Sequence, residues 1–172
     1  TGGVDVAKTF TQLPFDHLVF TGSTEVGRHV MRAAADNLTP VTLELGGKSP
    51  AIIHSDFPLD IAAHRIAFGK GINAGQICVA PDYVLLPREK VSAFANAFER
   101  AFAKLYPKLN DNRDYTAIIT DKQRDRLLDN IRDAESKGAT ITVINPADEM
   151  FDGTRKLPMH IARDVTDGMR LM

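Results

Sequence analysis

A regular alternation of strand-like runs and helical patterns is the feature that most constrains how this chain can fold. Short runs rich in β-branched and aliphatic residues lie at 17–21, 41–45, 50–54, 83–86 and 139–144. Most of the intervals between them carry apolar residues at helical spacing. Parallel strands need long crossover connections, which are usually helices. The order therefore predicts an α/β fold with a mostly parallel sheet and flanking helices.

The clearest helical pattern covers residues 88–105. Its apolar side chains recur every three or four residues and form one stripe: Val91, Phe94, Ala95, Phe98, Ala101, Phe102 and Leu105. Such a stripe could form a groove for a partner, but core packing against a sheet is the expected role. A capping box at Thr120–Gln123 predicts a further helix, which Gly138 ends.

Composition and charge exclude several classes of protein. A chain of 172 residues that is 44% hydrophobic and 25% charged can build its own core. A net charge of -1 provides no strong field to attract nucleic acid or an anionic membrane. No apolar run approaches the roughly 20 residues that cross a bilayer, and no signal peptide is visible, so we expect a cytoplasmic protein. The histidines lack metal-ligand spacing, which predicts no metal site: they lie at 17, 29, 54, 64 and 160.

The single cysteine, Cys78, lies in Gly75-Gln-Ile-Cys-Val-Ala-Pro81, between a helical pattern and a strand-like run. One thiol cannot form an internal disulfide, which indicates a reducing compartment. The residue can be a small buried hydrophobe or a nucleophile. A nucleophile needs an exposed turn with free backbone N–H groups to hold an oxyanion, and the glycine and proline around Cys78 favour such a turn.

An acidic residue, Glu44, interrupts the apolar run Val41-Thr-Leu-Glu-Leu45 directly before Gly46-Gly47. Burial in that run would suit the carboxylate to act as a general base. An edge strand with one solvated face would explain it equally well. The glycines leave room for a large or flat group to approach the backbone.

The segment Phe20-Thr-Gly-Ser-Thr-Glu-Val-Gly27 leads from a strand-like run into a helix. The helical pattern continues through Val26, Val30, Met31, Ala34 and Leu38. The N-terminus of such a helix presents unpaired N–H groups to a pyrophosphate. An ordinary turn with Ser23 or Thr24 as N-cap fits the same residues equally well.

Taken together, these motifs resemble those of the aldehyde dehydrogenase family. Phe20-Thr-Gly-Ser23, Leu43-Glu-Leu-Gly-Gly-Lys-Ser-Pro50 and Gly75-Gln-Ile-Cys78 stand in the family's order and approximate spacing, and the resemblance spans essentially the entire chain. Ala80-Pro-Asp-Tyr83 is similar to the branch that oxidises long-chain and aromatic aldehydes, and the segment is most similar to bacterial coniferyl aldehyde dehydrogenases.

The family's subunits are far longer, so the resemblance implies a central fragment. Residues 1–47 would be the C-terminal part of the Rossmann-like nucleotide-binding domain, and residues 48–172 a truncated catalytic domain.

The resemblance also implies roles for individual residues. Cys78 would attack the aldehyde and carry the thioester, and Glu44 would activate the water that hydrolyses it to an acid. A cofactor turn would be formed by Thr21, Gly22, Ser23, Gly27, Leu45 and Gly46. The implied cofactor is NAD or NADP, with NAD favoured, and the implied parent protein is a homo-oligomer.

Two alternatives stay open. An acylating enzyme would pass the acyl group to coenzyme A instead of water, and a packing module would bury Cys78 and leave Glu44 solvated. The resemblance further implies that a second oxyanion donor and a ligand of the nicotinamide ribose lie outside residues 1–172. We therefore expect this chain to fold without oxidising aldehydes by itself.

Overall fold

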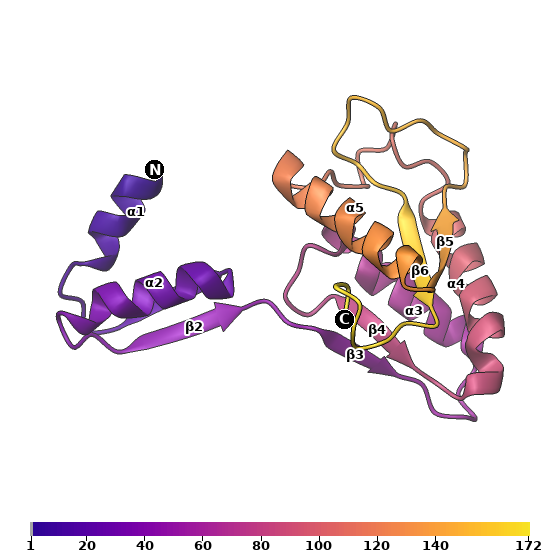
Figure 1. Cartoon of the computed structure of the whole chain (residues 1–172), viewed down its shortest axis with the longest axis horizontal. Coiled ribbons are helices and arrows are strands. Elements are labelled where there is room, and N and C mark those ends of the chain that lie inside the picture. The colour runs from indigo at the N-terminus through magenta and orange to yellow at the C-terminus, as the bar shows by residue number, and fades with distance from the viewer. Residues whose placement is uncertain (1) are drawn as a thin grey trace. The chain divides into compact units, whose positions relative to one another are not determined.

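The computed structural model describes residues 2–172, which form two compact units divided between Lys48 and Ser49 (Figure 1). Each unit alternates helices with short strands, and the strands make three two-stranded sheets. Two of these sheets are parallel and the third is antiparallel. The predicted α/β class is confirmed, with parallel pairing in both units and one antiparallel pair that was not foreseen.

The first unit contains α1 (Val4–Thr11), β1 (Leu18–Gly22), α2 (Thr24–Ala35) and β2 (Val41–Leu45). β1 and β2 pair in parallel, with Leu18 beside Val41 and Gly22 beside Leu45, and α2 is the crossover between them. This is the predicted order of strand, turn, helix and strand. α1 was not predicted; none of its residues is buried.

A glycine lies at the contact between α2 and β2. A Cβ atom at Gly27 would lie 3.1 Å from Leu45 Cδ2, closer than ordinary van der Waals contact. On the predicted apolar stripe of α2, Val30 and Ala34 are buried, whereas Leu38 lies beyond the helix end and is 89% exposed. Val26 and Met31 are also exposed, so the stripe is only partly covered within residues 2–172.

The second unit contains the remaining elements in chain order: β3 (Ser49–Ile52), α3 (Leu59–Gly71), the 3-10 turn η1 (Ile72–Gly75), β4 (Pro81–Leu85), the 3-10 turn η2 (Arg88–Lys90), α4 (Val91–Leu105), α5 (Asp121–Ser136), β5 (Thr140–Ile144) and β6 (Met159–Arg163). β3 pairs in parallel with β4, and β5 pairs antiparallel with β6. β6 was not predicted. Thr120 caps α5 as expected, since its hydroxyl accepts the N–H of Gln123 at 3.3 Å. No helix among residues 2–172 is long and apolar enough to cross a membrane.

The core of the second unit is built on the aromatic stripe of α4. Phe94, Phe98 and Phe102 are buried, and the Phe102 ring lies 6.0 Å from that of Tyr115 in an edge-on arrangement. α4 packs chiefly on α3, which contributes small buried side chains such as Ala63, and it also contacts β5. The stripe therefore serves core packing, as predicted, although its main neighbour is a helix.

Replacing Phe102 with alanine should strongly destabilise this unit. The side chain is completely buried among other aromatic rings, so its removal leaves a cavity and should cost about 3–5 kcal/mol of unfolding free energy. Urea unfolding monitored by circular dichroism measures the loss. Phe68→Ala on α3 is the matched control, because Phe68 is 55% exposed and should cost less than about 1 kcal/mol. Equal losses in the two variants would contradict the assignment of Phe102 to the core.

Candidate functional site

Cys78 lies in a tight turn between η1 and β4. The turn is closed by the N–H of Ala80, which donates to the Ile77 carbonyl at 3.1 Å. The thiol is unpaired and the residue is exposed. The Cys78 carbonyl accepts a long bond from the Ser49 hydroxyl at 3.5 Å, while its N–H donates to no acceptor within residues 2–172. An accessible sulfur beside a free backbone N–H is the arrangement expected of a nucleophile with its own oxyanion donor.

Glu44 lies on β2 and is exposed, so the burial considered for it is not found within residues 2–172. Leu43 and Leu45 face α2, and alternation along the strand directs Glu44 to the opposite face. Thr21 on β1 is the register partner of Glu44 and is exposed as well. The solvated edge-strand interpretation therefore describes Glu44 within this unit.

Residues of the proposed cofactor turn divide into two groups. Thr21, Gly22, Ser23 and Gly46 are exposed, and nothing lies within 4 Å of a Cβ built on Gly46. Ser23 is the N-cap of α2, with its hydroxyl accepting the Val26 N–H at 3.3 Å. Gly27 and Leu45 instead contact each other across the helix–strand interface, so both have a packing role.

Among the residues predicted for the site, Glu44 and the turn residues belong to the first unit, and Cys78 to the second. Within the first unit the sheet register places Thr21 beside Glu44 and Gly22 beside Leu45. In the sequence, Gln76 stands out only as part of the motif that contains Cys78. In the structure its side chain makes three hydrogen bonds.

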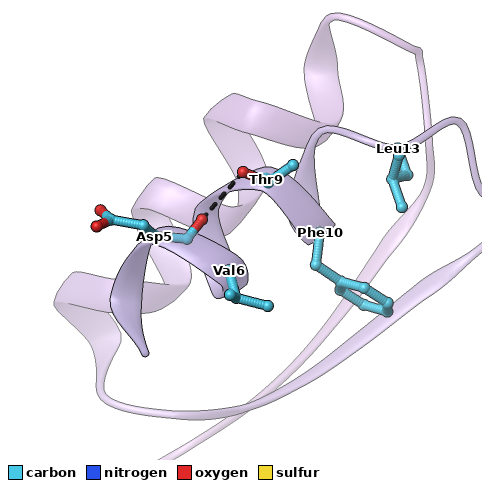
Figure 2. Close-up of a pocket in the computed structure, with 5 residues that line it drawn as sticks. All are labelled: Asp5, Val6, Thr9, Phe10 and Leu13. Atoms are coloured by element: carbon cyan, nitrogen blue, oxygen red, sulfur yellow. Dashed lines mark hydrogen bonds between the residues drawn. The ribbon is translucent and has the colours of Figure 1, made fainter. Parts of the chain in front are cut away.

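A surface hollow lies along α1 and includes none of the predicted site residues. Figure 2 shows it lined by Val6, Phe10 and Leu13, with the Thr9 hydroxyl donating to the Asp5 carbonyl at 3.0 Å. Its lining is mostly apolar and offers no nucleophile or pair of titratable groups. No cluster of three His, Cys, Asp or Glu side chains suited to a metal ion occurs in the described part of the chain. The chemistry-bearing groups thus remain those around Cys78 and Glu44.

Two charged side chains, Glu149 and Lys156, hold the loop that follows α4 through hydrogen bonds to its backbone. The Glu149 carboxylate accepts the backbone N–H groups of Leu109, Asn110 and Asp111. The Lys156 ammonium donates to the carbonyls of Leu109, Asn110 and Asn112 at 3.0, 2.8 and 2.6 Å. The Leu109 N–H bond is the main cause that lowers the pKa of Glu149, with further bonds from the next two amides and against the opposing effect of desolvation.

Glu149→Gln should destabilise the protein at neutral pH and reduce its sensitivity to acid. A carboxyl whose folded-state pKa is lowered contributes its full stabilisation above the ordinary value of 4.5 and loses it as the pH falls through the folded-state pKa. Urea midpoints measured at pH 7 and at several values below 4.5 test this. Asp152→Asn is the control, because Asp152 is exposed on the loop between β5 and β6 that also carries Glu149. If the urea midpoints of the wild type and Glu149→Gln fell by equal amounts on acidification, the prediction would be contradicted.

Comparison with known proteins agrees with the resemblance seen in the motifs. The whole chain, residues 1–172, matches the sequence model of the aldehyde dehydrogenase family. It is 53% identical over 99% of its length to the "Probable coniferyl aldehyde dehydrogenase" of Pseudomonas aeruginosa, and 49% identical to the coniferyl aldehyde dehydrogenase of a Pseudomonas species. The chain spans 35% and 36% of these two relatives.

A solved structure agrees with the fold. The NAD-dependent benzaldehyde dehydrogenase of Corynebacterium glutamicum is 30% identical and superposes with a TM-score of 0.82, over 99% of this chain and 37% of that one. Sequence and structure therefore lead to the same family, and the chain belongs to the aldehyde dehydrogenase family.

Proposed function

We propose that this chain supplies the nucleophile and the general base for NAD(P)-dependent oxidation of an aldehyde to a carboxylic acid. The observation that carries the proposal is the single thiol, Cys78, exposed in a tight turn with its own N–H unpaired in the described residues. The relatives named for coniferyl aldehyde and the neighbour named for benzaldehyde support an aromatic substrate, with a long-chain aldehyde as the second possibility.

In the proposed reaction the Cys78 sulfur bonds to the aldehyde carbon, and the Cys78 N–H stabilises the oxygen anion that forms. When bound, the nicotinamide supplies the hydride acceptor. Loss of hydride from the Cys78 adduct leaves a thioester on the same sulfur. Glu44 then takes a proton from water, which attacks the thioester carbon, so the carboxylic acid leaves and the thiolate is restored.

The residues of the first unit fit a dinucleotide. The first N–H groups of α2 have no partners within the helix. The Ser23 hydroxyl caps the third of them, and the others stand beside the exposed Thr21 and Gly22. Gly46 leaves open space at the end of β2, where a side chain would obstruct a flat ring. These residues would hold the cofactor, and the NAD-dependent neighbour favours NAD.

Two observations weigh against the alternatives. A packing module would bury its thiol, whereas Cys78 is exposed in the described structure. A coenzyme A acceptor needs no base held for water, whereas Glu44 has an accessible carboxylate. Product analysis separates hydrolysis from transfer to coenzyme A, because hydrolysis gives a free acid and transfer gives a coenzyme A thioester.

The test uses two assays. Residues 1–172 are treated with p-nitrophenyl acetate, and acetylation of Cys78 is followed by nitrophenolate release and by mass. An enzyme of the relatives' full length that carries these residues is given NAD⁺ or NADP⁺ and an aromatic aldehyde, and cofactor reduction is followed by absorbance. We expect slow but Cys78-dependent acetylation in the first assay, and Cys78-dependent cofactor reduction in the second. Failure of either assay would overturn the proposal.

A further inference from the structure

Gln76, two residues before Cys78, ties two distant segments of the second unit together. Its Nε2 donates to the Ala117 carbonyl at 3.1 Å and to the Asn73 carbonyl at 3.0 Å, and its Oε1 accepts the Ile119 N–H at 2.9 Å. Both donor hydrogens and one acceptor site of the amide are therefore in use. The bonds to Ala117 and Ile119 cross 41 and 43 residues of sequence. A glutamine that only solvates the surface would make no such set of contacts.

The backbone that precedes Gln76 is held in an uncommon conformation. Asn73, Ala74 and Gly75 follow one another with φ values of 50°, 51° and 75°, all in the left-handed region. Glycine adopts this region freely, but for alanine it is strained. The turn is closed by Asn73, whose side-chain amide donates to the Gln76 carbonyl at 3.2 Å and whose carbonyl accepts the Gln76 N–H at 3.1 Å. Contacts around Gln76 must therefore maintain the turn that leads into Cys78.

The segment that receives Gln76 is itself fixed to the core. Ile118 is buried, and its N–H donates to the Arg155 carbonyl at 3.0 Å. The Tyr115 hydroxyl donates to the Leu157 carbonyl at 2.8 Å, and its ring packs on that of Phe102. Burial of Tyr115 also raises the pKa of its hydroxyl, consistent with an inaccessible group. Gln76 thus connects the Cys78 turn to a segment that is hydrogen-bonded and packed into the core.

We propose that Gln76 is a positioning residue for Cys78: by bonding to Ala117 and Ile119 it fixes the left-handed turn and so sets the direction of the Cys78 N–H. This inference rests on the proposed function, because a fixed N–H matters only where an oxyanion forms. An N–H that already points at the position of the oxyanion stabilises the negative charge as it forms, because the protein need not rearrange first. Without the Gln76 side-chain bonds, the Cys78 thiol would stay in place, but the direction of the Cys78 N–H would no longer be fixed.

Two reagents separate these effects on the same sulfur. With p-nitrophenyl acetate the Cys78 thiolate bonds to the carbonyl carbon, an oxyanion forms and collapses, and the carbon–oxygen bond to nitrophenolate breaks. The thiol proton goes to solvent. Iodoacetamide reacts at a tetrahedral carbon, where the sulfur–carbon bond forms as iodide leaves, and no carbonyl oxygen becomes charged. Acetylation therefore depends on the Cys78 N–H, whereas alkylation depends only on the thiolate and its accessibility.

The variants are Gln76→Met, which removes all three side-chain bonds at similar volume, and Gln76→Glu, which keeps the acceptor for the Ile119 N–H. We expect acetylation of Cys78 to fall by about ten to a hundredfold in Gln76→Met, the scale of a small misplacement, with a smaller fall in Gln76→Glu. Alkylation of Gln76→Met should change by less than about twofold, because the sulfur stays exposed and no charge is added. In Gln76→Glu the added carboxylate disfavours the thiolate and slows both reactions, so the ratio of acetylation to alkylation is compared. Gln123→Met on α5 is the matched control and should leave both rates unchanged.

Each possible outcome supports or contradicts the positioning role of Gln76. Equal falls in acetylation and alkylation, or no change in either, would overturn the positioning role while leaving the proposed nucleophile intact. A wild-type chain that alkylates at Cys78 but is not acetylated would instead contradict the proposed function. Thermal unfolding is recorded for every variant. Should Gln76→Met be unfolded at the assay temperature, the ratio of the two rates in Gln76→Glu decides, since that variant retains one anchor.

Discussion

Cys78→Ser is expected to abolish acyl transfer to the chain, with a fall of about a thousandfold or more in the rate of nitrophenolate release from p-nitrophenyl acetate. A thiol is partly ionised near neutral pH, whereas a serine hydroxyl needs a strong base beside it. No side chain of the second unit is hydrogen-bonded to the Cys78 sulfur to act in that way; only the Ser49 hydroxyl contacts its carbonyl. Mass spectrometry of the treated chain measures the result, and Cys78 is the only cysteine of the sequence.

The control moves the thiol without removing it. In the Cys78→Ser background, Asn96→Cys places a single sulfur at an exposed position in the middle of α4. This introduced thiol should alkylate with iodoacetamide, yet its backbone N–H is engaged within the helix and cannot stabilise an oxyanion. We expect acetylation of the introduced thiol to be far slower than acetylation of Cys78 in the wild type. Equal acetylation at both positions would show that the Cys78 turn contributes nothing beyond exposure.

The sequence contains most of the local information for the fold. β2 was predicted because its apolar, β-branched run ends at glycines, and β5 because its run begins after a glycine. α4 was predicted because its aromatic residues repeat with helical spacing. α1 escaped prediction, and none of its residues is buried in this unit. β6 escaped because all five of its residues are at least partly buried, so no alternation marks the strand.

Long-range relations could not be predicted in the same way. Nothing in Met159–Arg163 indicates that it pairs antiparallel with β5 after a long connection. Gly27 fits a cofactor turn and a close helix–strand contact equally well on local grounds, and only the tertiary packing of α2 on the paired β1 and β2 reveals that it lies against Leu45.

In the candidate site, too, local features could be predicted from the sequence and long-range contacts could not. Exposure of Cys78 was foreseeable from the glycine and proline that punctuate its turn, whereas the anchor of that turn was not. Gln76 binds Ala117 and Ile119, which follow a polar loop with no motif of its own. A side-chain amide can satisfy any nearby backbone group, so its partner is determined by tertiary structure and leaves no pattern in the sequence.

Glu44→Gln is expected to separate the two halves of the proposed reaction. Acetylation of Cys78 needs no general base for water, so its rate should stay within about twofold of the wild type. Hydrolysis of the acetyl-Cys78 thioester should slow by about 10²–10⁴-fold, the contribution typical of a general base, because glutamine cannot accept the proton of water. The lifetime of the acetylated chain, followed by mass after excess ester is removed, measures this step.

Glu25→Gln provides the control, because Glu25 is another exposed carboxylate of the first unit, in the first turn of α2. If any negative charge on the first unit were sufficient, both variants would lengthen the acetyl lifetime by similar amounts. A specific base requires that only Glu44→Gln does so. An unchanged lifetime in Glu44→Gln would exclude the carboxylate from thioester hydrolysis, and its place opposite the packed face of β2 would then have to be explained by solvation alone.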